Sequence, residues 1–521
     1  MRKNRMLPGL LAGTVLSLLG CGLGFAATSS EVADAVMNRS ADRVLTLLNQ
    51  KADVNVPQAD GTTALLWAVR HDDLATVDQL IRAGADVKAQ NRDGATAMYL
   101  ACVNGNVAAI ERLIKAGADV NATFLTHGET PLMEASRSGN IEVVKLLLDH
   151  GAQVDAKDTI KATTALMWAA EQNHPEVVRM LAAKGADVNA QSTVGTAKKR
   201  YGVVYAQGED AHTGGVTPLV LAAREGALAA VEALYEVKAN LNKPSGDGSS
   251  AMLVAIQNGH YDVAKFLVDR GADVNLANEK GWNPLYLTVK HRNIETGTIP
   301  VPHQDQAMGF IQVLLDHKVN VNARVKANTE IRNGQRATWL NEAGATPFLR
   351  AALCGDIEVM KMLVAHGADP KIATDDHTTP LMAAAGVGYS DGFIHDRSVE
   401  ETIEAMKYIL DLGADVNAAN DAGLTALHGA AHKAANEEIQ LLVDRGADLG
   451  AKDHGSKAFG QNSPGLLPLN WAEGVPVGVQ SAIYHADTVD LITKLMKDKG
   501  VPIPTITRTV GGNAVATKIV R

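Results

Sequence analysis

The sequence predicts an all-α protein in which pairs of short antiparallel helices stack into a solenoid. A short opening, Gly-x-Thr or a close variant followed by Pro or Ala, recurs along most of the chain. Its first residues are Gly61, Gly94, Gly128, Ala162, Gly215, Gly248, Gly281, Gly344, His377 and Gly423. Where no insertion intervenes, the opening returns after 33 residues, as from Gly61 to Gly94. A fixed period of this size indicates a repeat architecture, in which chain length sets the number of repeats.

One repeat, residues 128–157, shows why each unit forms two helices. Thr130 can accept hydrogen bonds from the first turn of a helix, and Pro131 at the first helical position loses no bond. Gly139 can adopt the left-handed conformation that ends this helix. Asn140 can cap a second helix, which Gly151 closes. The apolar residues of that second helix recur at spacings of three and four: Ile141, Val143, Val144, Leu146, Leu147 and Leu148.

Both helices are too short to be stable alone in water, so each repeat needs neighbours to bury its apolar face. The 33-residue period, the T-P-L opening and the G-A-D-V-N ending at 185–189, 271–275 and 413–417 resemble the ankyrin repeat. The resemblance implies a helix-turn-helix with a β-hairpin finger in each repeat. It also implies that a protein partner binds the concave surface and the finger tips.

The openings also predict how the chain is organised. We expect twelve repeats, including a capping repeat at each end, because the flanking segments keep helical spacing but not the full opening. The expected segments are a signal peptide at 1–26, an N-terminal cap at 27–60, repeats at 61–464, a C-terminal cap at 465–500 and an extended tail at 501–521. Insertions are expected at 192–214, 293–307, 324–343, 386–399 and 452–464. The first, third and fifth of these insertions would lengthen the fingers.

The first residues have the pattern of an export signal. Arg2, Lys3 and Arg5 precede an apolar run that is short for a membrane span, and small residues follow at 24–27. Two cleavage sites fit this pattern. Gly24 to Ala26 offers the small residues that a signal peptidase reads, whereas residues 18–21 resemble a bacterial lipobox in which Cys21 would be lipidated. Both predict an exported protein, periplasmic, anchored to the outer membrane as a lipoprotein, or secreted.

Charge and cysteine content narrow the function further. Removing the three basic residues of the signal peptide takes the formal charge from -9 to -12, and such an acidic chain is unsuited to binding nucleic acids or anionic membranes. Beyond Cys21 there are only Cys102 and Cys354, in repeats too far apart to meet within one solenoid. We therefore expect stability from packing and not from disulfides.

No sequence motif indicates catalysis, a metal or a cofactor. The chain has no G-x-S-x-G, H-E-x-x-H, phosphate-binding glycine loop or C-x-x-C. His428 and His432 have the spacing of a metal pair, but His428 stands where the ankyrin T-P-L-H opening places a hydrogen-bonding histidine. Three tryptophans stand six positions after a repeat opening, where aliphatic residues stand in other repeats, and are interpreted as packing between layers: Trp67, Trp168 and Trp471.

The predicted partner-binding residues fall into two sets. Nine positions after an opening, at the exposed end of the first helix, stand Arg70, Arg137, Glu171, Arg224, Gln257 and Lys290, which would line one groove. The second set lies on a finger tip or in insertions and comprises Trp282, Tyr201, Tyr205, Arg332, Arg336 and Trp339. Arg, Tyr and Trp often dominate interface energetics, so these residues favour a protein partner with an acidic surface. Solvated helix faces and plain surface loops are the simpler interpretations of the same residues.

Two other functions stay open at this stage. Tyr201, Tyr205, Trp282 and Trp339 could serve a module that binds carbohydrate or cell wall. An enzyme could build a site from the insertions, which offer His303, Asp305, His395 and Asp396, though without a recognisable catalytic arrangement.

Overall fold

The computed structural model describes residues 30–124, 127–198, 210–293, 304–328, 339–389, 397–455, 465–475, 483–503, 509–510 and 513–514. These residues form 24 α-helices, most of them seven to ten residues long, which confirms the predicted all-α solenoid. The chain divides into two compact units, unit 1 up to Asp119 and unit 2 from Val120.

The described residues of unit 1 form three helix pairs. Its helices are α1 (Glu31–Met37), α2 (Ala41–Asn49), α3 (Ala64–Arg70), α4 (Leu74–Arg82), α5 (Ala97–Asn104) and α6 (Val107–Lys115). Helix α3 packs against both α1 and α5, and α4 packs against α6. Helices α1 and α2 lie in the stretch expected to form the N-terminal cap.

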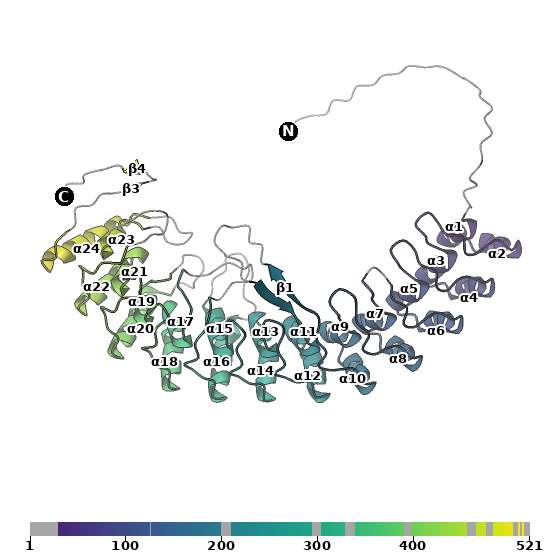
Figure 1. Ribbon diagram of the computed structural model, residues 1–521, viewed down its shortest axis with the longest axis horizontal. Helices are drawn as coiled ribbons and strands as arrows, with labels where there is room; N and C mark the ends of the chain where they lie inside the picture. Colours follow the sequence, from purple (N-terminus) through teal and green to yellow (C-terminus); the bar gives the residue numbers. More distant parts are fainter. Residues whose placement is uncertain are drawn as a thin grey trace, which may run out of the picture. The chain divides into compact units, whose positions relative to one another are not determined.

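Unit 2 continues the pattern with nine helix pairs among its described residues, arranged in two rows (Figure 1). The first helices of the pairs are α7 (Pro131–Ser138), α9 (Ala165–Glu171), α11 (Pro218–Glu225), α13 (Ala251–Gln257), α15 (Pro284–Arg292), α17 (Pro347–Leu353), α19 (Pro380–Ala384), α21 (Ala426–Lys433) and α23 (Pro468–Ala472). The second helices are α8 (Ile141–Asp149), α10 (Pro175–Ala183), α12 (Leu228–Glu236), α14 (Tyr261–Asp269), α16 (Ala307–Asp316), α18 (Ile357–Ala365), α20 (Val399–Asp411), α22 (Asn436–Asp444) and α24 (Ala486–Asp498). A short 3-10 turn, η1 (Gln304–Gln306), precedes α16.

The local rules that predict the helix pair hold in the structure. Thr130 Oγ1 accepts a hydrogen bond from the backbone N–H of Met133 at 3.3 Å, and Gly139 ends α7 with φ +73°. Asn140 Oδ1 accepts from Val143 N at 3.1 Å and so caps α8. Of the six apolar residues predicted for α8, Val143, Val144 and Leu147 are buried, whereas Ile141 is exposed.

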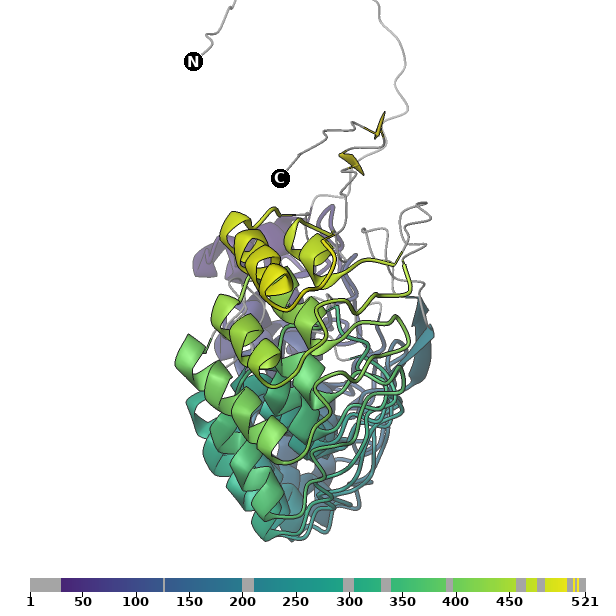
Figure 2. The same cartoon turned by 90° about the vertical axis from the view of Figure 1, so that its left-hand side faces the viewer.

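Backbone hydrogen bonds join successive fingers. Thr159 N donates to His127 O at 2.9 Å, Glu279 N to Asp247 O at 3.1 Å and His454 N to Ala422 O at 2.8 Å. One finger of unit 2 is lengthened by the antiparallel strands β1 (Val194–Lys198) and β2 (Asp210–Gly214), in which Val194 pairs with Gly214. Figure 2 shows the fingers of unit 2 on one side of the helix rows, with this hairpin among them. Strands β3 (Thr509–Val510) and β4 (Asn513–Ala514) pair within the C-terminal tail.

A second ladder, made by side chains, ties several of the fingers to the next repeat. Asn121 Nδ2 donates to Gly151 O at 3.0 Å, while its Oδ1 accepts from Gln153 N at 2.8 Å. Asn55, Asn322 and Asn417 each make the same pair of hydrogen bonds. At the equivalent place Asp155 only accepts, from Asp187 N at 3.0 Å, because a carboxylate has no N–H to donate.

This difference predicts a stabilising substitution. Asp155→Asn should add a hydrogen bond from the new amide to Gly185 O and raise the free energy of unfolding by about 0.5–1 kcal/mol, the usual net value of one such bond. Urea unfolding of the purified protein measures the effect. Asp273→Asn is the control, because Asp273 accepts within its own turn, from Asn275 N. If both substitutions change the free energy of unfolding equally, the added ladder hydrogen bond does not stabilise the fold.

Candidate functional site

The predicted groove residues of α7, α9 and α11 are held in place by their neighbours. Arg137 makes a two-pronged ion pair with Glu134, with Nε to Oε2 at 3.1 Å and Nη2 to Oε1 at 2.8 Å. The Glu134 carboxylate is nearly buried, whereas the Arg137 side chain is 48% exposed. The Arg137 guanidinium also lies 6.0 Å from the ring centroid of Trp168 on the next first helix. Arg137 is therefore fixed against two repeats while it faces solvent.

The next first helix continues this arrangement. Arg224 on α11 pairs with Glu171 on α9, and its Nε donates to Glu225 Oε1 at 2.8 Å. The Arg224 side chain is 43% exposed. Gln257 on α13 is half-buried. Acidic and basic side chains thus alternate along the exposed ends of these helices, and each is restrained by a partner from its own repeat or the next one.

Arg70 has a similar setting in unit 1. Its guanidinium lies 5.3 Å from the centroid of Trp67, and Trp67 Nε1 donates to Gln58 Oε1 at 2.7 Å. The ring of His71 also stacks on Trp67, with a centroid distance of 5.6 Å. The half-buried Trp67 thus supports Arg70 from within its own repeat.

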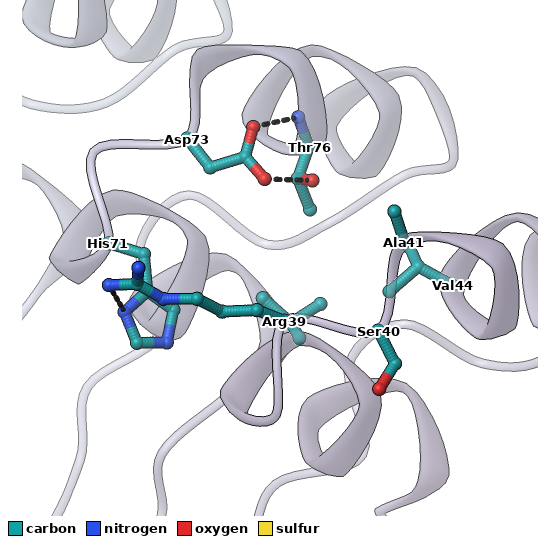
Figure 3. A pocket seen from close by; sticks show the side chains of 8 residues that line it. Arg39, Ser40, Ala41, Val44, His71, Asp73 and Thr76 are labelled. Carbon is teal, nitrogen blue, oxygen red and sulfur yellow. Dashed lines mark hydrogen bonds between the residues drawn. The ribbon is translucent and has the colours of Figure 1, made fainter.

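A shallow pocket of about 250 Å³ opens between the helix pairs α1–α2 and α3–α4 (Figure 3). Arg39 can only donate, so its bond to His71 Nδ1 at 3.2 Å leaves His71 Nε2 to donate to Met37 O at 3.2 Å. On the opposite wall Asp73 accepts from Thr76 N and Oγ1. Partial burial raises the pKa of Asp73, but these hydrogen bonds outweigh it and leave the pKa below its usual value. The hydrogen bonds drawn in Figure 3 therefore serve the turns between the helices.

Lys290 does not line a groove. Its side chain is 2% exposed, so the expectation that it stands at an exposed helix end is wrong. On the same helix, Tyr286 packs with Val325 and Leu340 of the insertion 324–343 and with Leu349 of α17 in one apolar cluster. The two described ends of the insertion that was expected to project from the finger edge thus pack against the first helices α15 and α17.

The two predicted contact tryptophans also make intramolecular contacts. Trp282 packs against the same apolar cluster, and its Nε1 donates to Ala327 O at 3.2 Å. Trp339 Nε1 donates to Tyr389 O at 2.6 Å, and its ring meets that of His432 edge to face at 6.0 Å. Both rings are half-buried. A role for either ring in partner binding stays a prediction.

Beneath this covered surface lies a buried ion pair that the sequence analysis missed. Arg350 Nη1 donates to Glu342 Oε1 at 3.1 Å, and both side chains are fully buried. Tyr286 Oη donates to the same carboxylate oxygen at 3.1 Å, and burial raises the pKa of this tyrosine well above its usual value. A signal was present in the sequence. Arg350 stands six positions after its opening, where most repeats carry an aliphatic or tryptophan residue.

A second missed cluster surrounds Asp356, which is 1% exposed at the start of α18. Its Oδ2 accepts from Arg292 Nε at 2.8 Å and from Asn293 Nδ2 at 2.8 Å, and lies 3.2 Å from Arg397 Nη2. Arg397 Nη2 also donates to Asn293 Oδ1 at 2.9 Å. Near both clusters, burial raises the pKa of the Cys354 thiol to about 11, so this thiol stays protonated at neutral pH.

His428 has the hydrogen-bonding position that its motif implies. Its Nδ1 accepts from Thr425 N at 3.1 Å, and its Nε2 donates to Leu466 O at 3.1 Å. Burial lowers the pKa of this histidine below its usual value, which favours the neutral ring that this arrangement needs. The neighbouring His432 meets Trp471 edge to face at 5.6 Å. Within the described ranges, no group of three or more His, Cys, Asp or Glu side chains is arranged to hold a metal ion.

Several predicted residues lie outside the part of the chain that the structure describes. They are Cys21, Tyr201, Tyr205, His303, Arg332, Arg336, His395 and Asp396. Of the side chains considered for an enzyme, Asp305 is described and is exposed in η1. Cys102 and Cys354 are both buried. The described helices include none with the length and apolar composition needed to cross a bilayer.

Comparison with known proteins adds independent findings. The family described as "Ankyrin repeats (3 copies)" matches residues 32–124, 122–192 and 201–278, and "Ankyrin repeat" matches 343–375 and 422–454. The chain is 29% identical over 238 residues to the "Probable E3 ubiquitin-protein ligase XBOS33" of Oryza sativa subsp. japonica, which covers 45% of this chain and 39% of that protein. It is 27% identical over 185 residues to the "Putative ankyrin repeat protein YahD" of Escherichia coli (strain K12), covering 33% of this chain and 90% of that protein.

Among solved structures, the human ASB11 ankyrin repeat domain is similar, with 24% identity and a TM-score of 0.38. The match covers 46% of this chain and 98% of that domain. The chain spans 39% of the rice protein, well under two thirds of its length.

Proposed function

This chain belongs to the ankyrin-repeat family, and from that premise we propose that it is an exported scaffold that binds another protein along its first helices and fingers. Ankyrin-repeat domains generally serve as scaffolds for protein–protein interaction. The row of Arg137, Glu171 and Arg224 on α7, α9 and α11 is the observation that carries the proposal. These side chains are partly exposed, yet each is restrained by ion pairs or by an aromatic ring.

Restraint of this kind favours binding because fewer rotamers are lost when a partner docks. Arginine beside a tryptophan ring is also a frequent energetic centre of protein interfaces. By contrast, Lys290 is buried, and residues of the insertion 324–343 pack against the first helices α15 and α17. We therefore place the partner surface on α7 to α13. The hairpin β1–β2 precedes α11 and would form one wall of this surface.

The test is capture of a partner from a periplasmic extract. The double variant Arg137→Ala and Arg224→Ala should lower the affinity for the captured protein at least tenfold, since a hot-spot residue contributes about 2 kcal/mol or more. The matched control is Arg179→Ala with Arg445→Ala, because these arginines are similarly exposed, at 43% and 39%, and are also paired with acids. A third variant replaces residues 192–214 by a short glycine turn, which should keep the fold and weaken capture.

Two results would contradict the proposal. One is equal binding by the groove variant, the control variant and the unmodified protein. The other is capture of a glycan in place of a protein partner, or catalytic turnover by the purified protein itself. If the finger variant alone binds normally, the groove carries recognition and the finger is a surface loop.

Export is the second part of the proposal, supported by the order of basic, apolar and small residues in 1–27. The mature protein from the native cell should begin at Cys21 with lipid attached, or near Ala27 without lipid. Intact mass measurement of the cell fractions decides between these two. Recovery of the chain from the cytoplasm with Met1 still present would argue against export.

A further inference from the structure

Two aromatic rings and two cationic side chains gather at the ends of the second helices α12 and α14. The rings of Tyr235 and Phe266 meet edge to face, with a centroid distance of 5.9 Å. The guanidinium carbon of Arg270 lies 4.9 Å from the centroid of Phe266 and 5.5 Å from that of Tyr235. Lys238 Nζ lies 5.7 Å from the Tyr235 centroid. The cations are exposed and the rings are half-buried, so this aromatic–cationic patch faces solvent.

In two other repeats, the cation that follows a second helix is paired with an acid on the preceding second helix. Lys184 follows α10 and pairs with Asp149, the last residue of α8, at 2.9 Å. Arg445 follows α22 and pairs with Asp411, the last residue of α20, at 3.0 Å. Arg270 follows α14 in the same way, so the regular pattern predicts that it pairs with the last residue of α12.

The acid that would neutralise Arg270 is engaged elsewhere. Glu236 ends α12, but its Oε2 accepts from Arg179 Nε of α10 at 2.6 Å. Asp269, next to Arg270 in the sequence, pairs with Lys265 at 2.6 Å. Within the described residues, neither cation of the patch forms an ion pair. Their N–H groups are therefore available to an anion from outside the chain.

Packing between repeats does not account for the two rings. The residue before the last one of a second helix is aliphatic in α8, α10 and α14, where Leu148, Ala182 and Val268 stand at the position of Tyr235. The helix dipole favours cations near a helix C-terminus, which explains the two cations but not the rings beneath them. Aromatic residues and arginine are enriched at the centres of protein interfaces, so their combination here indicates a contact surface.

We propose that the aromatic–cationic patch binds an acidic segment of a protein partner, with carboxylates on Lys238 and Arg270 and an apolar side chain on the rings. A guanidinium that stacks on an aromatic ring uses its flat face, and its N–H edge can still donate two hydrogen bonds to a carboxylate. The ring contacts also restrain both cations, so less side-chain freedom is lost on docking. The patch lies in the row of second helices, apart from the proposed surface on the first helices (Figure 1).

The experiment measures, by fluorescence anisotropy, how a labelled hexapeptide of alternating glutamate and leucine binds the full-length mature protein. The reference peptide carries glutamine in place of each glutamate. We expect the glutamate peptide to bind about tenfold more tightly, because only carboxylates can make the charge-assisted hydrogen bonds. Its affinity should fall with added salt, since ions screen the attraction between exposed charges.

Lys238→Gln with Arg270→Gln is the decisive variant, because it removes both exposed charges of the patch and leaves the rings in place. We expect its Kd for the glutamate peptide to rise about tenfold or more. The matched control is Lys184→Gln with Arg445→Gln, which removes the same charge from two other repeats, where the cations are 46% and 39% exposed and already paired. The control should leave the Kd nearly unchanged. Equal unfolding midpoints show that both variants keep the fold.

The proposal is overturned if the glutamine peptide binds as tightly as the glutamate peptide. It is also overturned if the patch variant and the control variant lose the same affinity, because net charge alone would then cause the loss. Binding of the unmodified protein to phosphatidylglycerol vesicles without binding of the glutamate peptide would overturn it too, in favour of a membrane contact. The patch variant keeps Arg137 and Arg224, so failure here leaves partner capture by α7 to α13 as a separate question.

Discussion

Replacing Glu342 by alanine will lower the free energy of unfolding by about 3–5 kcal/mol, the range for breaking one side of a buried ion pair. The loss is large because Arg350 would stay buried with none of its hydrogen bonds to Glu342, and Tyr286 would lose its acceptor. Urea unfolding of purified Glu342→Ala measures the change. Spectra of the helical content should stay the same under native conditions, because the pair lies outside the helix caps.

Two controls show whether burial causes this loss. Asp375→Ala removes the acid from the pair with Arg324, whose side chains are 47% and 61% exposed, and should cost less than about 1 kcal/mol. Arg350→Met with Glu342→Leu removes both buried charges and should be far less destabilising than Glu342→Ala alone. If the double variant is the least stable of the three, the ion pair itself contributes net stability.

Leu147→Ala should cost about 2–5 kcal/mol, the usual range for truncating a core leucine. Leu147 is fully buried on α8, between the first helix of its own repeat and the second helix of the next. Hydrogen exchange should rise mainly in α7 to α10, because contacts in a solenoid link nearest neighbours. Ile141→Ala on the same helix is the control, since Ile141 is 38% exposed and should contribute much less. Similar costs for both would mean that the buried face of α8 is assigned wrongly.

Sequence reasoning succeeds here where structure depends on residues close together in the chain. The roles of Thr130, Gly139 and Asn140 are local, because a cap bonds to backbone groups within the next few residues and a left-handed glycine ends its own helix. The 33-residue period extends these local rules along the chain, and with them the stacking of equivalent helices. The hydrogen-bonding role of His428 follows from the same register.

Reasoning from the register fails where an insertion changes what lies above a helix. Lys290 occupies a position that is partly exposed in the regular repeats, and the repeat period does not indicate that it is buried here. The pairing of Arg350 also escapes the repeat period, because its carboxylate partner Glu342 lies in the insertion 324–343 and not in a helix. The position of such a partner depends on loop conformation, which a repeat period does not encode.

The Asp356 cluster has a consequence for how the chain yields to force. Arg397, in the repeat that opens at His377, bonds to Asn293, in the repeat that opens at Gly281, and both contact Asp356 in the repeat between them. Elsewhere in a repeat array, layers can peel away one at a time because each is held only by its neighbours. Three layers fastened at one buried point must instead detach together. Under tension these repeats would rupture in one long step, and during synthesis this segment would complete its packing only when the third layer had emerged.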